Sequence, residues 1–348
     1  MSWLTDGDDD GEYSEYDESA AKVRPNPKAN KPRSKIRPEH ANALSGRVFS
    51  VDRGRFGVWV DENSAQERQL IATRARELPK KSIVTGDRVD LVGDVTGEEG
   101  SLARIVRVQP RLTLLRRSAD DTDSVERIIV ANADQMLIVV AAANPEPRPR
   151  LVDRYLVAAF DAGITPILVI TKTDLQDPAE FLANFAGLDL DIIQSRSDDF
   201  PLDDIRARLE AHTTVAVGHS GVGKSTLVNA LVPDANRAVG RVNDVTGRGR
   251  HTSSSTISYR IGAGWIVDTP GVRSFGLGHV DPANILKSFT DLALLAENCP
   301  RGCTHLPDAP DCNIVEQVQA GALGENGTLR LDSFQRLITT LGSASLGT

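Results

Sequence analysis

The feature that most restricts the fold is a glycine-rich segment near the middle of the chain, Gly218-His219-Ser220-Gly221-Val222-Gly223-Lys224-Ser225. It follows the pattern G-x-x-x-x-G-K-[ST] and lies between an apolar run typical of a buried strand and a helical pattern. Glycines at these positions allow successive backbone N–H groups to point inward, at the start of a helix whose dipole attracts anions. The pattern therefore predicts a nucleoside-triphosphate site that spans Gly218 to Thr226, rather than an incidental glycine-rich turn. Lys224 is expected to reach the β- and γ-phosphates and assist catalysis, and Ser225 to bind Mg²⁺.

A second motif, Thr171-Lys172-Thr173-Asp174, follows another apolar strand pattern. It is similar to the N-K-x-D motif with which GTPases read guanine. The Asp174 carboxylate would accept hydrogen bonds from the ring N–H and the exocyclic amine of guanine, a pair of donors that adenine lacks. Lys172 would lie along the base. Thr171 replaces the usual Asn, so we expect the loss of an amide that ties this loop to the phosphate loop, with weaker nucleotide affinity but the same base preference. A polar strand-end loop is the plain alternative.

Two further segments complete a nucleotide-binding pattern. Asp268-Thr269-Pro270-Gly271 matches D-x-x-G, in which Asp268 would hold Mg²⁺ through water and the Gly271 N–H would contact the γ-phosphate. Gln194-Ser195-Arg196 stands where GTPases place a serine loop that supports the base. Ordinary GTPases carry the phosphate loop first, whereas here the base-reading motif and serine loop precede it. The same sheet can be built in this order if the usual chain termini are joined and the chain is opened at another loop. The sequence therefore predicts a circularly permuted GTPase domain.

The pattern of apolar runs predicts three folded domains, with an α/β fold class overall. Residues 45–110 carry short strand patterns around turns and predict a small β-barrel, an OB-fold first and an SH3-like barrel as the alternative. Residues 111–276 alternate buried strands with helices, as in a parallel sheet covered on both faces. Residues 277–348 read as helices around a cysteine cluster. Four arginines of the barrel are expected at its surface, for nucleic acid or as ordinary charges: Arg53, Arg55, Arg104 and Arg107.

The cysteine cluster predicts a structural zinc site. All three cysteines of the chain, Cys299, Cys303 and Cys312, lie within 14 residues, with His305 between them. Three thiolates and one imidazole form a complete tetrahedral ligand set with no position left for water. Such a site stabilises a small helical domain that has little core of its own. Reduced structural cysteines without a metal are the alternative.

The first 44 residues read as a disordered tail with two blocks of opposite charge. Residues 1–21 carry eight acids and no base, and residues 22–38 carry seven bases, four prolines and no acid. The basic block is either a solvated linker or an arm that binds RNA phosphates. No apolar run reaches the ~18–20 residues of a membrane span, so we expect no membrane association and a cytoplasmic location. We also expect the chain to be a monomer.

Taken together, these motifs resemble the ribosome small-subunit-dependent GTPase A (RsgA, also called YjeQ) family. The resemblance covers about residues 45–340 and also rests on Val125-Glu126-Arg127, Asp153-Arg154-Tyr155-Leu156, Gly249-Arg250-His251-Thr252 and Asp268 to Arg273. It implies a GTPase that binds the small ribosomal subunit and its rRNA late in maturation and is stimulated by the subunit to hydrolyse GTP to GDP.

The resemblance also implies roles for the first switch, residues 249–254. Thr252 would contact the γ-phosphate and Mg²⁺, although Ser253 and Ser254 follow it and offer the same hydroxyl. Val272 stands where many GTPases carry a water-orienting Gln, so His251 is the candidate for that role. Two alternatives to the resemblance are a nucleotide-dependent kinase or ATPase, against which Asp174 argues, and a passive RNA-binding module, against which Lys224, Ser225 and Asp268 argue.

Overall fold

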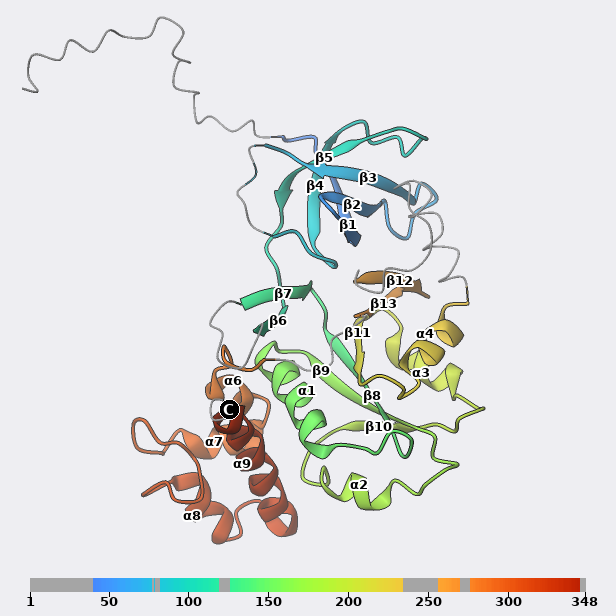
Figure 1. Ribbon diagram of the computed structural model, residues 1–348. Coiled ribbons are helices and arrows are strands. Elements are labelled where there is room, and N and C mark those ends of the chain that lie inside the picture. Colours follow the sequence, from blue (N-terminus) through green and yellow to red (C-terminus); the bar gives the residue numbers. More distant parts are fainter. Residues whose placement is uncertain are drawn as a thin grey trace, which may run out of the picture. The chain divides into compact units, whose positions relative to one another are not determined.

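The computed structural model describes residues 40–76, 78, 82–118, 126–233, 256–269 and 276–344. The described residues begin with five strands in the order β1-β2-β3-β5-β4, which close through a β1–β4 pairing (Figure 1). Only β3 and β5 run parallel. This closed five-stranded topology is that of an OB-fold, so the first of the two predicted barrels is confirmed. The strands are β1 (Leu44–Asp52), β2 (Arg55–Val60), β3 (Arg68–Arg74), β4 (Arg88–Gly93) and β5 (Ala103–Val108).

A two-stranded hairpin that the sequence analysis did not predict follows the barrel. Its strands β6 (Leu114–Ser118) and β7 (Glu126–Ala131) pair antiparallel. Leu115 and Val130 are buried in the hydrophobic core that also contains the first helix of the next domain. The hairpin therefore packs with the α/β domain, and it is also joined to the loop before β4, where the Ala131 N–H donates to the Thr85 carbonyl oxygen at 3.0 Å.

The α/β domain is built on the predicted parallel sheet, in the order β10-β9-β8-β11-β13-β12. Only β12 runs antiparallel to its neighbour, and the sequence analysis missed this strand. Its burial pattern is broken by half-buried polar residues, so it lacks the continuous apolar run of the other strands. The strands are β8 (Gln135–Ala141), β9 (Thr165–Thr171), β10 (Asp191–Gln194), β11 (Thr213–Gly218), β12 (Ile257–Ile261) and β13 (Gly264–Asp268).

Alternate side chains of β8 enter two separate cores, because successive residues of a strand point to opposite faces. Met136 and Ile138 pack with α1 (Pro149–Asp161) and α2 (Ala179–Ala183). Leu137 and Val139 pack with α3 (Leu202–Leu209) and α4 (Lys224–Leu231). The sheet is therefore covered on both faces, as predicted.

The barrel joins the α/β sheet through one backbone pair and a group of aromatic and basic side chains. Ser50 of β1 pairs with Ile257 of β12, which makes the two sheets continuous. Two guanidinium groups lie over the ring of Trp265 of β13, with Arg47 of the barrel at 5.4 Å and Arg260 of β12 at 5.2 Å from the ring centre. The Arg47 cation–π contact fixes the barrel against the sheet that carries the phosphate loop, whereas the Arg260 contact lies within that sheet.

The C-terminal segment contains α6 (Pro282–Lys287), α7 (Thr290–Ala296), α8 (Asn313–Gln319), the 3-10 turn Gly324–Asn326 and α9 (Gly327–Ala344) (Figure 1). Its apolar residues share one core with α1, so it is fastened to the α/β domain. Arg336 of α9 donates through Nε to the buried Asp153 carboxylate of α1 at 3.2 Å. Within the described part of the chain, no helix is long and apolar enough to cross a membrane.

Candidate nucleotide site and metal centre

The phosphate loop has the predicted place and backbone shape. It leaves β11 at Gly218 and enters α4 at Lys224. A Cβ on Gly218 would stand 2.5 Å from the Val139 carbonyl oxygen, so only glycine fits there. Gly223 caps α4 with a φ of 93°, a conformation that strains other residues. The loop therefore presents backbone N–H groups at a helix N-terminus, and Ser225 and Thr226 are exposed there.

The base-reading motif lies against the phosphate loop, but its first residue does not behave as predicted. Thr171 is 1 % exposed at the end of β9, and its hydroxyl donates to the Val222 carbonyl oxygen at 2.6 Å. The expectation that replacing Asn by Thr removes the link between the two loops is therefore wrong. The β-branched hydroxyl is short, but β9 ends close enough to the loop for it to reach the backbone directly.

Lys172 makes a second link between these loops. Its backbone is left-handed, with a φ of 60°, and its ammonium group donates to the Gly221 carbonyl oxygen at 2.9 Å and to that of Asn144. Two successive residues of the base-reading motif thus hold two successive carbonyl groups of the phosphate loop. This bonding places the two predicted recognition elements at one edge of the sheet.

Asp174 is held by a residue that the sequence analysis did not single out. Its carboxylate accepts from the Ser197 backbone N–H at 2.6 Å and from the Ser197 hydroxyl at 2.9 Å. The backbone hydrogen bond is the main cause that lowers the pKa of Asp174, so the group is a charged acceptor at neutral pH. Short serine-containing loops are common, and the serine two positions past the predicted one gave no separate signal.

Ser195, the predicted serine, supports the loop instead. It is 3 % exposed, and its hydroxyl donates within its own loop, to the carbonyl oxygens of Arg196 at 3.1 Å and Asp199 at 3.3 Å. Its own carbonyl oxygen accepts from the N–H and hydroxyl groups of Thr173, both at 3.1 Å. Ser195 therefore binds the base-reading motif to β10, while Ser197 contacts the carboxylate.

Lys224 and Asp268 face each other across the first turn of α4. The ammonium group of Lys224 donates to the Asp268 carboxylate, and both side chains are largely buried. Asp268 ends β13, which runs parallel to β11 and pairs Asp268 with Ala216. Thr269 fixes this corner, since its buried hydroxyl donates to the Ala216 carbonyl oxygen at 2.8 Å. The D-x-x-G strand and the phosphate loop therefore meet as predicted.

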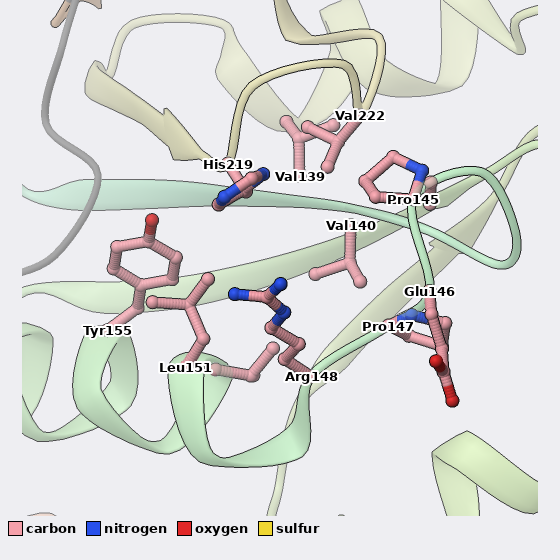
Figure 2. Close-up of a pocket in the computed structure, with 12 residues that line it drawn as sticks. Val139, Val140, Pro145, Glu146, Pro147, Arg148, Leu151, Tyr155, His219 and Val222 are labelled. Atoms are coloured by element: carbon pink, nitrogen blue, oxygen red, sulfur yellow. The ribbon is translucent and has the colours of Figure 1, made fainter.

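A small cavity adjoins the phosphate loop on the α1 side (Figure 2). His219 and Val222 come from the loop, and Arg148, Leu151 and Tyr155 come from the start of α1. Figure 2 shows the Tyr155 hydroxyl and the Arg148 guanidinium directed toward His219. With about 20 Å³, the cavity has room for about one water molecule and not for a nucleotide.

The predicted metal ligands converge in the C-terminal domain. The four donor atoms of Cys299, Cys303, His305 and Cys312 lie within 4.8 Å of one another. Cys299 Sγ lies 3.6 Å from His305 Nδ1 and 4.0 Å from Cys312 Sγ. Tetrahedral Zn²⁺, with bonds of about 2.3 Å to sulfur and 2.0–2.1 Å to nitrogen, separates its ligand atoms by roughly 3.5–3.8 Å. The cluster therefore has the chemistry and the size to bind a metal ion.

Residues around the cluster hold it in place. Gln335 of α9 donates to the His305 carbonyl oxygen at 2.9 Å, and the Phe334 ring packs 6.3 Å from the imidazole. Burial raises the pKa of the Cys312 thiol to about 11 and lowers the pKa of His305. Metal binding must therefore release the Cys312 proton, as at other thiolate sites.

Comparison with known proteins decides the family. The family described as RsgA GTPase matches residues 108–278. The small ribosomal subunit biogenesis GTPase RsgA 1 of Vibrio vulnificus is 34% identical over 296 residues, which cover 82% of each chain. The protein named small ribosomal subunit biogenesis GTPase RsgA in Pseudomonas syringae is 36% identical over 300 residues, or 82% of this chain and 83% of that one.

The chain belongs to the RsgA GTPase family. Two solved structures share its fold, and both comparisons give a TM-score of 0.63 and cover 88% of this chain. One is YloQ, described as a circularly permuted GTPase, at 23% identity and 98% coverage of its own chain. The other is YjeQ from Thermotoga maritima, at 25% identity and 99% coverage. The permuted order predicted from the motifs is thereby confirmed as that of the RsgA fold.

Several predicted site residues of this RsgA family member lie outside the described residues. They are His251 and Thr252 of the first switch, with Ser253 and Ser254, and Gly271 of the D-x-x-G motif. Their predicted roles stay predictions. The side chains of Thr171 and Ser195 are buried and bond to carbonyl groups of the protein. The other predicted nucleotide contacts among the described residues lie on the phosphate loop, on the motif bonded to it or at the end of β13.

Proposed function

We propose that this chain hydrolyses GTP to GDP and phosphate and acts in the late maturation of the small ribosomal subunit, which stimulates the hydrolysis. The GTPase proposal rests on the hydrogen bonds that join the base-reading motif to the phosphate loop. The base-reading motif donates through Thr171 and Lys172 to the carbonyl groups of Val222 and Gly221 in the phosphate loop. A charged carboxylate acceptor on a motif that is bonded to the phosphate loop fits a guanine nucleotide. The relatives' printed names, which give biogenesis of the small ribosomal subunit, support the partner.

In this proposal each site residue has a distinct task. Asp174 accepts from guanine, and the backbone of Gly218 to Thr226 holds the phosphates. Lys224 exchanges its contact with Asp268 for the β- and γ-phosphates, whose charge it neutralises in the transition state. Thr252 contacts the γ-phosphate, and His251 orients the attacking water.

Magnesium fits the proposed site because its described donors are hard oxygen ligands. The Ser225 hydroxyl is exposed at the start of α4, and the Asp268 carboxylate lies beside Lys224 at the same edge. Thr252 is the third proposed contact. Bound Mg²⁺ would neutralise charge that develops on the phosphate oxygens.

For the C-terminal cluster we propose one structural Zn²⁺, because three sulfurs and one nitrogen are a closed ligand set that suits this ion. We further propose a monomer in the cytoplasm with domain boundaries near residues 44, 110 and 276. The OB barrel, the zinc domain and the basic segment 22–38 would together contact rRNA.

The test measures GTP hydrolysis by the full chain, alone and with purified small ribosomal subunits. We expect slow basal turnover that the small subunit raises at least about 10-fold, with no comparable use of ATP. Lys224→Ala should lower turnover by at least about 100-fold, because it removes a charge that acts on the transition state. Fast turnover without the subunit would contradict the ribosomal partner. Equal use of ATP would contradict the role of Asp174.

A further inference from the structure

A second, larger pocket lies where the barrel meets the α/β domain, away from the phosphate loop. It has a volume of about 430 Å³, within the range of about 300–1,000 Å³ typical of ligand sites. Its wall combines residues of β1, β2, β3, α3, α4 and β12, among them Phe49, Trp59, Gln69, Arg206, Leu231 and Tyr259. We refer to it as the junction pocket. None of these residues has a role in the nucleotide site or the metal centre.

The barrel side of the junction pocket is the face with which OB-folds bind oligonucleotides. Trp59 on β2 pairs directly with Gln69 on β3, and the faces of strands 2 and 3 are the usual binding surface of this fold. Trp59 is half-buried, and Gln69 is exposed. Tyr259, also half-buried, contributes an aromatic ring from the opposite side. Every nucleobase can stack on such rings.

The wall also carries a polar group, the amide of Gln69, which offers donors and an acceptor to an occupant. The edge of a nucleobase can pair with this amide, whereas a wholly apolar occupant would leave it without a partner.

A cation lies at the wall of the pocket. The Arg206 side chain is 40 % exposed. One of its nitrogens donates to the Asp203 carboxylate at 3.3 Å, and another donates to the Ala230 carbonyl oxygen at 3.2 Å. This contact holds the guanidinium near the end of α4, where it can also meet a phosphate. Aromatic rings, polar edge groups and an arginine are the combination that recognises an unpaired base with its backbone.

We propose that the junction pocket binds an unpaired nucleobase of RNA. The base would stack against Trp59 and Tyr259, with its polar edge toward Gln69. This inference rests on the proposed function, because the ribosomal subunit would supply the RNA.

The pocket wall is close to the nucleotide site. Tyr259 lies on β12, which pairs with β13, the strand that ends at Asp268. Burial, and next the charge of Asp268, raise the pKa of Tyr259 to about 12. Occupancy of the pocket should therefore affect hydrolysis as well as binding.

The test compares two fluorescent probes of equal charge, a uridine hexanucleotide and the same ribose-phosphate hexamer without bases. The full chain should bind the uridine probe at least about 5-fold more tightly, as one stacked base provides. Gln69→Trp fills the pocket from an exposed strand position and should abolish the difference. Gln66→Trp is the matched control, since Gln66 is equally exposed but does not line the pocket.

A wild-type chain that binds both probes equally, or a Gln69→Trp variant that keeps the full preference, would overturn the proposal. If Gln69→Trp instead loses stimulation by small subunits while no probe shows base dependence, the pocket binds a protein side chain and the proposal is wrong. Stimulation of the wild-type enzyme by small subunits is measured in parallel. If stimulation is absent while the base preference persists, the proposed function fails and the pocket assignment stands.

Discussion

The Thr171 hydroxyl and the Val222 carbonyl oxygen lie 2.6 Å apart and join the base-reading loop to the phosphate loop. Thr171→Ala should weaken GTP binding about 3- to 10-fold, because a buried carbonyl loses its donor and the two loops are no longer held in register. Thr171→Ser keeps the hydroxyl and should stay within about 2-fold of the wild type. Titration with a fluorescent GTP analogue measures both. Equal affinities of all three proteins would show that this bond does not organise the site.

Asp174→Asn should change which base is preferred. The amide presents a donor toward the exocyclic amine of guanine, so GTP affinity should fall about 10- to 100-fold. Xanthine carries a carbonyl group at that position, and xanthosine triphosphate should gain affinity. Competition binding with both nucleotides measures the change. As a control, Ser197→Ala removes one hydrogen bond to the carboxylate and should keep the preference for GTP. An unchanged preference in Asp174→Asn would remove Asp174 from base recognition.

Cys312→Ser should remove the bound metal and destabilise the C-terminal helices. Elemental analysis should find one zinc per wild-type chain and none in the variant, and the melting temperature should fall by at least about 10 °C. Thr304→Ala, an exposed position between two ligands, is the matched control and should retain the zinc. A wild-type chain that contains no zinc and melts at the same temperature with or without a chelator would contradict a structural zinc site.

Arg336→Ala should destabilise the fold at neutral pH, because it leaves the Asp153 carboxylate buried beside α9 without its cation. Breaking a buried pair costs about 3–5 kcal/mol, and the partial exposure of Arg336 reduces this to about 2–3 kcal/mol. Urea unfolding measures the difference. Arg301→Ala, at an exposed position of the metal-binding loop, is the control.

The loss of unfolding free energy caused by Arg336→Ala should become smaller as the pH falls. Burial raises the pKa of Asp153 above its usual value, whereas Arg336 lowers it, so the pKa rises further in the variant. A carboxyl group with a raised folded pKa binds its proton more tightly in the folded state, so stability increases as the pH falls through that pKa toward the unfolded value near 3.8. The difference in unfolding free energy between the variant and the wild type should therefore decrease over that pH interval. A difference that grows on acidification would contradict this account.

The sequence predicted the parts of the molecule that depend on local patterns. Continuous apolar runs identified β8, β9 and β11, and the glycine spacing identified the phosphate loop, because buried parallel strands and backbone-only anion sites tolerate few residue types. The sequence analysis missed the antiparallel β12, because half-buried residues such as Tyr259 and Arg260 interrupt any continuous apolar run in this strand.

The errors at the site arose where a contact depends on three-dimensional distance. The sequence shows that Thr171 replaces Asn, but not that β9 ends within hydroxyl reach of Val222. Likewise, Ser195 and Ser197 are equivalent in composition, and only the path of the loop places Ser197 against Asp174. Residue type predicted which groups could bond, and backbone geometry decided which of them do.

The single backbone pair between Ser50 and Ile257 has a mechanical consequence. A force on the barrel reaches β12 at this rung, at the residue that pairs across the sheet with Asp268, and also through Arg260, which bonds Asn63 and Glu67 of the barrel. A large partner that rotates the barrel would therefore displace the strand beside the one that ends at Asp268. Binding to the barrel would thus be coupled mechanically to the strand pair next to the phosphate loop.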